Sequence, residues 1–181
     1  MFDKMNINPL AMRTLMRLAR SPGREYYLRE IAADTGGSVG GTHRALAELR
    51  ALGLVRARRS GRNYYHAAEE RNPALRHVKI FASLLDIQPL VEALRPLSKK
   101  LVLFGSCATG EDTEDSDVDM LIVTGDEEGA RQAVKRYEGP RPVRPLILTP
   151  QKLLKARERD PAFHSEIDKG IILYRSEDER L

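Results

Sequence analysis

The chain has 181 residues, of which 41% are hydrophobic, and a formal net charge of +4 at pH 7, which suits one large domain or two small ones with ordinary cores. Its single cysteine excludes an intramolecular disulfide and a thiolate zinc site. The N-terminus lacks the basic start and apolar run of a signal peptide, and no apolar run approaches the about 18 residues of a membrane span. We therefore expect a soluble, cytoplasmic protein without membrane contact.

The net charge conceals an asymmetry between the two halves of the chain. Residues 1–80 contain 15 lysines and arginines against 7 acidic residues, whereas residues 81–181 contain 15 against 19. A basic front half and an acidic back half indicate two modules with different partners. The basic module is the candidate for binding a polyanion.

Three helices and a hairpin are predicted in the basic half. The helices begin at Asn8-Pro9, at Leu28 and at Ser38 or Gly40-Gly41, and they end at Ser21-Pro22-Gly23, at Thr35-Gly36-Gly37 and at Gly53. Asn8 is the expected N-cap of the first helix. The run LVRARRSGRNYYHAA then contains two β-prone segments around Ser60-Gly61, a pattern typical of a hairpin.

This order of elements, over LREIAADTGGSVGGTHRALAELRALGLVRARRSGRNYYH, resembles a winged helix-turn-helix domain. In that family the third helix enters the DNA major groove and the hairpin, called the wing, contacts the DNA backbone. The resemblance implies DNA contacts from the third helix and from the wing. The implied residues are Ser38, Thr42, His43 and Arg44 on the helix, and Arg58, Arg59, Arg62 and Asn63 on the wing.

Arginine suits this role because it reads guanine and also binds phosphate, with a gain that falls as salt rises. Winged-helix proteins commonly bind palindromic sites as dimers, so we expect a homodimer. The alternative is that the module serves dimerisation or protein contact, and that the arginines of the wing are merely solvated.

The middle of the chain is predicted to be helical. One helix begins at Asn72-Pro73, and a second short helix, Leu90 to Leu97, follows Pro89. We expect a winged helix-turn-helix domain over residues 1–70, a helical linker over 71–88 and a second domain over 89–181.

The stretch LVLFGSCATGEDTEDSDVDMLIV, residues 101–123, places six acidic residues between two predicted strands. Asp117 and Asp119 are two positions apart, so along a strand their side chains project to the same side. Two ionised carboxylates near a buried sheet repel each other unless a cation lies between them, and such oxygen ligands favour Mg²⁺ or Mn²⁺. The other four acids, Glu111, Asp112, Glu114 and Asp115, are expected to form a solvated loop.

Gly105-Ser106 follows the first of these strands, and the residues after it predict a turn of helix whose free amides attract phosphate. Beside a metal ion, this arrangement is a cradle for a triphosphate. The alternative for the whole stretch is an acidic surface loop without a ligand. Cys107 is expected to be a small packed residue, the alternative being a reactive thiol.

The segment FGSCATGEDTEDSDVDMLIV resembles the minimal signature of the polymerase-β-like nucleotidyltransferase superfamily, which is Gly-Ser, ten residues and Asp-x-Asp. The resemblance implies an α+β fold with a mixed sheet flanked by helices. It also implies that Asp117 and Asp119 are catalytic and bind divalent metal, and that Gly105 and Ser106 contact the phosphates of an NTP with support from Ser116. The implied reaction transfers a nucleoside monophosphate to a hydroxyl and releases pyrophosphate.

One feature departs from that superfamily, whose active members carry a third carboxylate on a later strand. The predicted strand Val143–Thr149 holds Arg144 and Pro145 there, and no acid occurs between Gly139 and Lys155. Three readings stay open: two aspartates suffice, an acid such as Glu138 comes from elsewhere, or the domain binds nucleotide without catalysis while Arg144 binds a phosphate. Pro145 favours an edge strand.

Two functions follow from these observations. The first is a DNA-binding protein whose nucleotidyltransferase domain transfers a nucleoside monophosphate to an unidentified hydroxyl acceptor. The second is a transcriptional regulator or antitoxin-like protein whose domain binds nucleotide, or a partner such as a helical toxin, but is catalytically impaired.

Overall fold

The computed structural model describes residues 9–159 and 161–176. The chain folds as two compact units, Met1–Lys79 and Ile80–Leu181. The N-cap expected at Asn8 lies outside the described residues. No described helix is long and apolar enough to cross a membrane.

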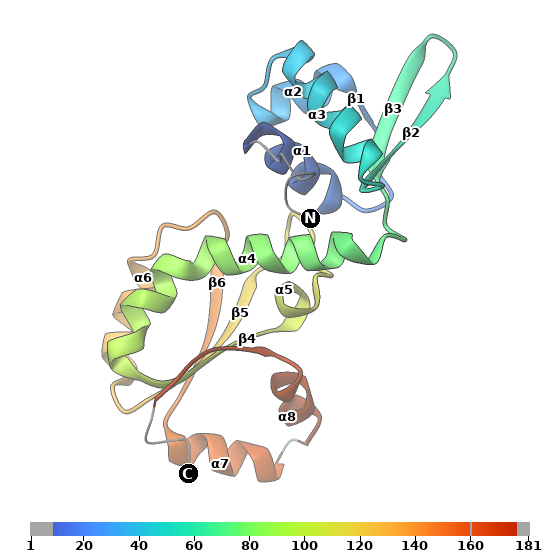
Figure 1. Ribbon diagram of the computed structural model, residues 1–181. Coiled ribbons are helices and arrows are strands. Elements are labelled where there is room, and N and C mark those ends of the chain that lie inside the picture. Colours follow the sequence, from blue (N-terminus) through green and yellow to red (C-terminus); the bar gives the residue numbers. More distant parts are fainter. Residues whose placement is uncertain (1–8, 160, 177–181) are drawn as a thin grey trace. The chain divides into compact units, whose positions relative to one another are not determined.

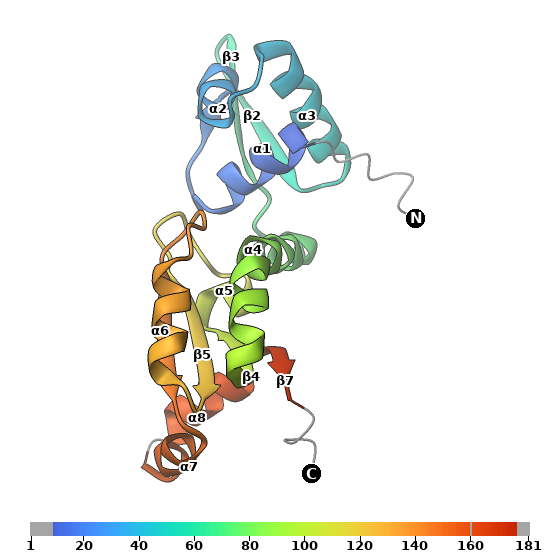
Figure 2. The same cartoon turned by 90° about the vertical axis from the view of Figure 1, so that its left-hand side faces the viewer.

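In the first unit the described residues form three helices, the start of a longer helix at Pro73 and a three-stranded antiparallel sheet. The three helices lie on one side of the hairpin strands (Figure 1, Figure 2). In chain order its elements are α1 Pro9–Ala19, β1 Tyr26–Tyr27, α2 Leu28–Thr35, α3 Val39–Ala51, β2 Val55–Ser60 and β3 Asn63–Ala68. Its core includes Leu15, Leu18, Ile31, Leu46 and Leu49, all of them buried. Strand β1 was not predicted, because two residues are too short for a periodic pattern.

Local chemistry explains where α2 and α3 meet. Gly36 has a φ of 64°, the left-handed conformation that ends a helix and that glycine adopts without strain. Ser38 then accepts a hydrogen bond on its Oγ from the backbone N–H of Gly41 at 3.1 Å. Helix α3 therefore begins after Ser38, and not at Gly40-Gly41.

Helix α4 differs from the prediction. It runs without interruption from Pro73 to Leu94, includes Pro89, and is followed by the short 3₁₀ helix η2, Arg95–Leu97. A proline inside a helix removes one hydrogen bond, but the burial of Ile87, Leu90 and Leu94 on both sides of Pro89 offsets that loss. Residues 73–88 of the expected linker therefore belong to one continuous helix, and the expected domain bounds stay a prediction.

The second unit is built on a four-stranded mixed sheet of order β6-β5-β4-β7, in which only β5 and β6 are parallel. The strands are β4 Ser98–Phe104, β5 Val118–Thr124, β6 Val143–Leu148 and β7 Ile171–Arg175. The remaining helices are α5 Gly105–Thr109, α6 Glu127–Lys135, α7 Pro150–Arg159 and α8 Pro161–Asp168. This confirms the expected mixed sheet flanked by helices, and β6 lies at the edge, as Pro145 predicted.

The sheet separates two hydrophobic clusters. Helices α4 and α6 pack on the face that carries Met120 and Ile122, and helices α7 and α8 lie on the face that carries Leu121 and Val123 (Figure 1). Because side chains alternate along a strand, Asp119 belongs to the second face, together with Leu121. The carboxylate therefore points to the side of the sheet where α7 and α8 pack.

Candidate functional site

The register of the sheet gathers the candidate residues at one edge. Phe104, the last residue of β4, pairs with Asp119 near the start of β5, and Asp119 pairs with Arg144 near the start of β6. Leu103 pairs with Ile171, the first residue of β7. One strand therefore ends where three others begin, and the residues that flank these positions meet there.

Gly105 and Asp119 are in close approach at this edge. Gly105 has a φ of +67°, and a Cβ at that position would lie 2.5 Å from Oδ2 of Asp119. Any side chain at position 105 would thus occupy the space beside the carboxylate and would also strain the backbone. Glycine is required here, because only a residue without a Cβ lets the carboxylate approach so closely. Gly105 and Ser106, the first two residues of α5, also line a cavity of about 200 Å³, which is the recess at this edge.

The charges around Asp119 compete. Burial raises the pKa of its carboxyl, and the guanidinium of Arg144 acts in the opposite direction. The carboxylates of Asp117 and Glu166 raise that pKa further. Asp117 precedes β5 and is exposed, whereas Asp119 is only partly exposed, so the two carboxylates of the motif have different surroundings.

The donor set fits a divalent cation that is shared with a substrate. Among the described residues, no group of three or more His, Cys, Asp or Glu side chains is arranged to hold a metal ion by itself. Two carboxylates beside a recess nevertheless match Mg²⁺, which is commonly held by one or two carboxylates together with substrate phosphates and water.

The acidic loop is not uniformly solvated, and the expectation for Asp112 was wrong. Asp112 is fully buried, and its Oδ2 accepts a hydrogen bond from Nη1 of Arg141 at 2.9 Å. Arg141 also donates to Oγ of Ser83 in α4 at 2.8 Å. A buried charge requires a partner of opposite charge. Here the partner lies in the loop before β6, far along the chain, so the sequence of the acidic loop alone does not predict that Asp112 is buried.

Two further residues of the signature shape this loop. Ser116 Oγ accepts a hydrogen bond from the backbone N–H of Thr113 at 2.9 Å, so this hydroxyl closes a turn; its contact with a nucleotide stays a prediction. Cys107 is buried, which confirms the expected packed residue. Its Sγ donates to the carbonyl oxygen of Asp117 at 3.3 Å and accepts from Nη1 of Arg141 at the same distance.

A further carboxylate comes from an unexpected part of the chain. Glu138 lies elsewhere, in a cavity of about 760 Å³ that it lines with Asp86 and Arg136. Glu166 of α8 instead lines a cavity of about 200 Å³ together with Gly105 and Ser106. No role was predicted for Glu166 from the sequence, because this residue belongs to no motif and lies in an ordinary amphipathic helix near the end of the chain.

In the first unit, the predicted DNA-contacting residues fall into different environments. His43 and Arg44 are exposed on α3, and Arg62 and Asn63 are exposed at the hairpin. Thr42 is fully buried, because helical periodicity turns it toward the core with Ala45 and Leu49. Thr42 therefore does not lie on the exposed side of α3, from which the DNA contacts were expected. Ser38 remains exposed, although its hydroxyl caps α3.

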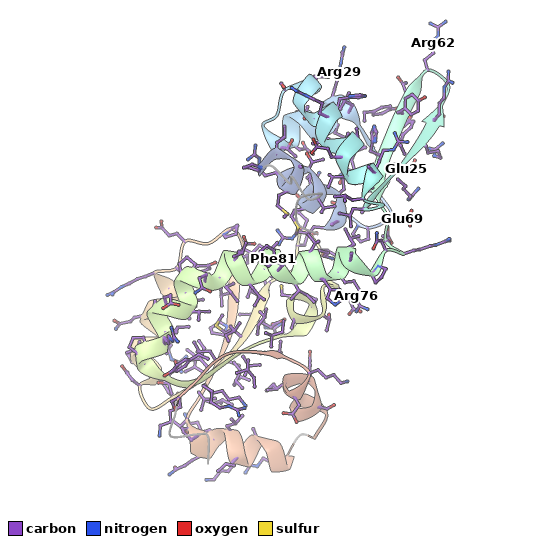
Figure 3. All side chains as sticks on the ribbon, viewed as in Figure 1. Glu25, Arg29, Arg62, Glu69, Arg76 and Phe81 are labelled. Atoms are coloured by element: carbon purple, nitrogen blue, oxygen red, sulfur yellow. The ribbon has the colours of Figure 1, made fainter. Side chains whose placement is uncertain are left out.

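The arginines of the hairpin are not equivalent. Arg58 donates to Glu25 through Nη2 at 2.6 Å and stacks on the ring of Tyr65, and Arg59 donates from Nε to the carbonyl of Gly61 at 3.1 Å. Figure 3 shows Arg62 extending away from the hairpin tip. Arg58 and Arg59 thus have partners within the unit, whereas Arg62 extends from the hairpin tip.

A basic cavity lies between α3 and the hairpin. It has a volume of about 1160 Å³, and its lining includes His43, Arg62 and Asn63 from the predicted set. Arg29 and Arg50 line it as well, and they were missed because they stand outside the helix start and the wing. Their positive charge extends the candidate polyanion surface across α2 and α3.

Comparisons with known proteins bear on the second unit. A family model described as "Nucleotidyltransferase domain" matches residues 87–178. No curated protein matches the chain. A crystal structure of human N-acetylserotonin methyltransferase in complex with SAM shows 18% sequence identity and a TM-score of 0.33, over 52% of this chain and 32% of that chain. This chain thus spans about a third of that one, and so weak a likeness carries no argument.

Proposed function

The chain belongs to the nucleotidyltransferase domain family, and from that premise we propose that it transfers a nucleoside monophosphate from an NTP to a hydroxyl acceptor. The observation that carries the proposal is the recess lined by Gly105 and Ser106, together with the close approach of Gly105 to the carboxylate of Asp119. A cavity beside a carboxylate suits a phosphate that shares a metal ion with that carboxylate.

Each residue of the edge has a proposed role. Asp117 and Asp119 hold Mg²⁺ or Mn²⁺, and Gly105 and Ser106 contact the phosphates, with Ser116 supporting the loop. The metal ion, when bound, neutralises negative charge on the phosphoryl oxygens. The acceptor oxygen attacks the α-phosphorus, pyrophosphate leaves, and the hydroxyl proton passes to a base or to water.

The proposal is tested with α-labelled NTPs, Mg²⁺ and candidate hydroxyl acceptors. We expect metal-dependent transfer by the wild-type protein and its loss in the Asp117→Asn/Asp119→Asn double variant. Asp115→Asn is the matched control, because it removes one exposed carboxylate from the same loop. If Mn²⁺ and NTP bind equally well to the double variant and to the wild type, the assignment of the site is wrong.

For the first unit we propose DNA binding. The order of three helices and a hairpin, the exposed His43 and Arg44, and the basic cavity beside them support this proposal. A homodimer on a palindromic site is the proposed form. Binding to DNA from upstream of the gene is expected to weaken steeply with salt, and equal affinity for any sequence at all salt concentrations would contradict sequence-specific recognition.

A second function, a regulator or antitoxin-like protein that binds nucleotide or a helical toxin without catalysis, is favoured by one observation. Arg144, a fixed cation, is the register partner of Asp119 and lowers the pKa of its carboxyl, as a bound metal ion would also do. Nucleotide binding that persists without transfer to any acceptor, together with transfer gained by Arg144→Asp, would favour this second function over the first.

A further inference from the structure

The cavity of about 200 Å³ beside Gly105 and Ser106 has a second wall that comes from α8 and the turn after it. Glu166 and Lys169 both line it, and they are three positions apart in the sequence. Residues with this spacing share one side of a helical turn. The cavity therefore receives one carboxylate and one ammonium group from the same short segment.

The topology explains why this segment reaches the recess. Strand β7 is antiparallel to β4, and its first residue, Ile171, pairs with Leu103. Lys169 and Gly170 therefore lie beside Phe104, the last residue of β4, and Gly105, which follows it. Gly170 makes the approach feasible, because a Cβ there would lie 2.6 Å from the carbonyl oxygen of Leu103.

The charges of this wall complement the proposed ligand. Phosphates require positive charge, and among the described residues that line the cavity only Lys169 supplies it. Glu166 lies on the same face of the sheet as Asp119, and its charge acts on that carboxyl. Mg²⁺ usually keeps several water molecules, and carboxylates around these waters tune the affinity for the metal.

On the basis of the proposed function, we propose that α8 completes the nucleotide site with a charge pair. Lys169 binds the polyphosphate of the nucleotide, and Glu166 accepts hydrogen bonds from water on the metal ion. Glu166 is thus a carboxylate that α8, and not β6, adds to the site, and Glu111 of the acidic loop lines the same cavity.

The test measures binding with two simple probes, Mn²⁺ alone and inorganic triphosphate with Mn²⁺, by electron paramagnetic resonance and calorimetry. Glu166→Gln is expected to weaken Mn²⁺ binding about tenfold to a hundredfold. Lys169→Met is expected to weaken triphosphate binding about tenfold and to leave Mn²⁺ binding undiminished. Because only Glu166→Gln is expected to weaken the binding of Mn²⁺ alone, the two variants separate these roles from a general loss of structure.

Two controls match the charge changes. Asp168→Asn removes a carboxylate from the same helix, and Lys155→Met removes an ammonium group from exposed α7; neither residue lines the cavity. Both variants are expected to bind both probes as the wild type does. Equal Mn²⁺ affinity in Glu166→Gln and Asp168→Asn, or equal triphosphate affinity in Lys169→Met and Lys155→Met, overturns the inference.

The failure of this inference differs from the failure of the proposed function. If Asp119→Asn loses Mn²⁺ binding while Glu166→Gln keeps it, the metal assignment stands and the role of α8 is wrong. If the wild-type protein binds neither probe, the proposed function itself is wrong, and the role of α8 is rejected with it.

Discussion

Arg141 and Asp112 form a buried ion pair in which Nη1 donates to Oδ2 at 2.9 Å, and their side chains are 6% and 0% exposed. The pair joins the acidic loop to the segment before β6, and Ser83 of α4 accepts a second hydrogen bond from the same guanidinium. Arg141 also touches Cys107, whose thiol donates to the backbone of Asp117. The pair thereby connects the core of the second unit to a proposed metal ligand.

Arg141→Met is expected to destabilise the protein by about 3–5 kcal/mol, because it leaves the buried Asp112 carboxylate without its guanidinium. Urea unfolding followed by circular dichroism measures the loss. Arg131→Met is the control, since Arg131 is 54% exposed and lies 3.6 Å from Glu127; exposed pairs of this kind contribute about 0.3–0.5 kcal/mol. Equal unfolding midpoints for the two variants would contradict the structural role of Arg141.

Gly105→Ala is expected to reduce Mn²⁺ affinity and to cost about 1–2 kcal/mol of stability, because φ is +67° and the new Cβ would collide with Asp119. Gly125→Ala is the matched control, since a Cβ at position 125 meets nothing within 4 Å. Calorimetric titration with Mn²⁺ measures the metal affinity of both variants. A Gly105→Ala protein with wild-type metal affinity would show that the recess is not used.

Arg144→Ala is expected to raise the pKa of Asp119 further, because burial already raises it and the guanidinium opposes that rise. A raised carboxyl pKa means that the contribution of Asp119 to stability is present below the unfolded pKa of about 3.9 and is lost as pH rises through the folded pKa. The variant extends this loss to higher pH. Carboxyl carbon NMR of the metal-free protein measures the pKa, with Asp119→Asn identifying the signal.

The same titration has an internal control. Arg131→Met removes an exposed arginine that is not among the groups acting on Asp119, so it is expected to leave the pKa unchanged. An unchanged pKa in Arg144→Ala as well would mean that Arg144 does not face Asp119 in solution.

Arg62→Ala is expected to weaken DNA binding more than Arg58→Ala, because Arg58 is held by Glu25 and its interaction lowers the pKa of that carboxyl. Loss of one phosphate contact reduces the slope of log affinity against log salt by about 1. Fluorescence anisotropy with DNA from upstream of the gene, at several salt concentrations, measures both effects.

Glu25→Gln completes this comparison. It releases Arg58 and removes a negative charge, so DNA binding is expected to tighten by a few-fold. If Arg58→Ala costs as much as Arg62→Ala, Arg58 exchanges Glu25 for phosphate on binding, and the ion pair seen here is not a barrier.

Short-range chemistry in the sequence determined much of this protein. Four features depend only on residues that are close in the chain. They are the left-handed glycine at Gly36, the cap at Ser38, the two strands around the acidic stretch, and the spacing from Gly105-Ser106 to Asp117 and Asp119. These features specify helices, strands and a candidate site, because they need only local hydrogen bonds, periodicity and spacing.

Tertiary structure alone decided which distant residues surround that site. Asp112 lies among exposed acids in the sequence, but Arg141 makes it a buried ion partner. Glu166 and Lys169 reach the recess only because β7 begins where β4 ends. Strand order and register bring such residues together, and neither is encoded in local periodicity.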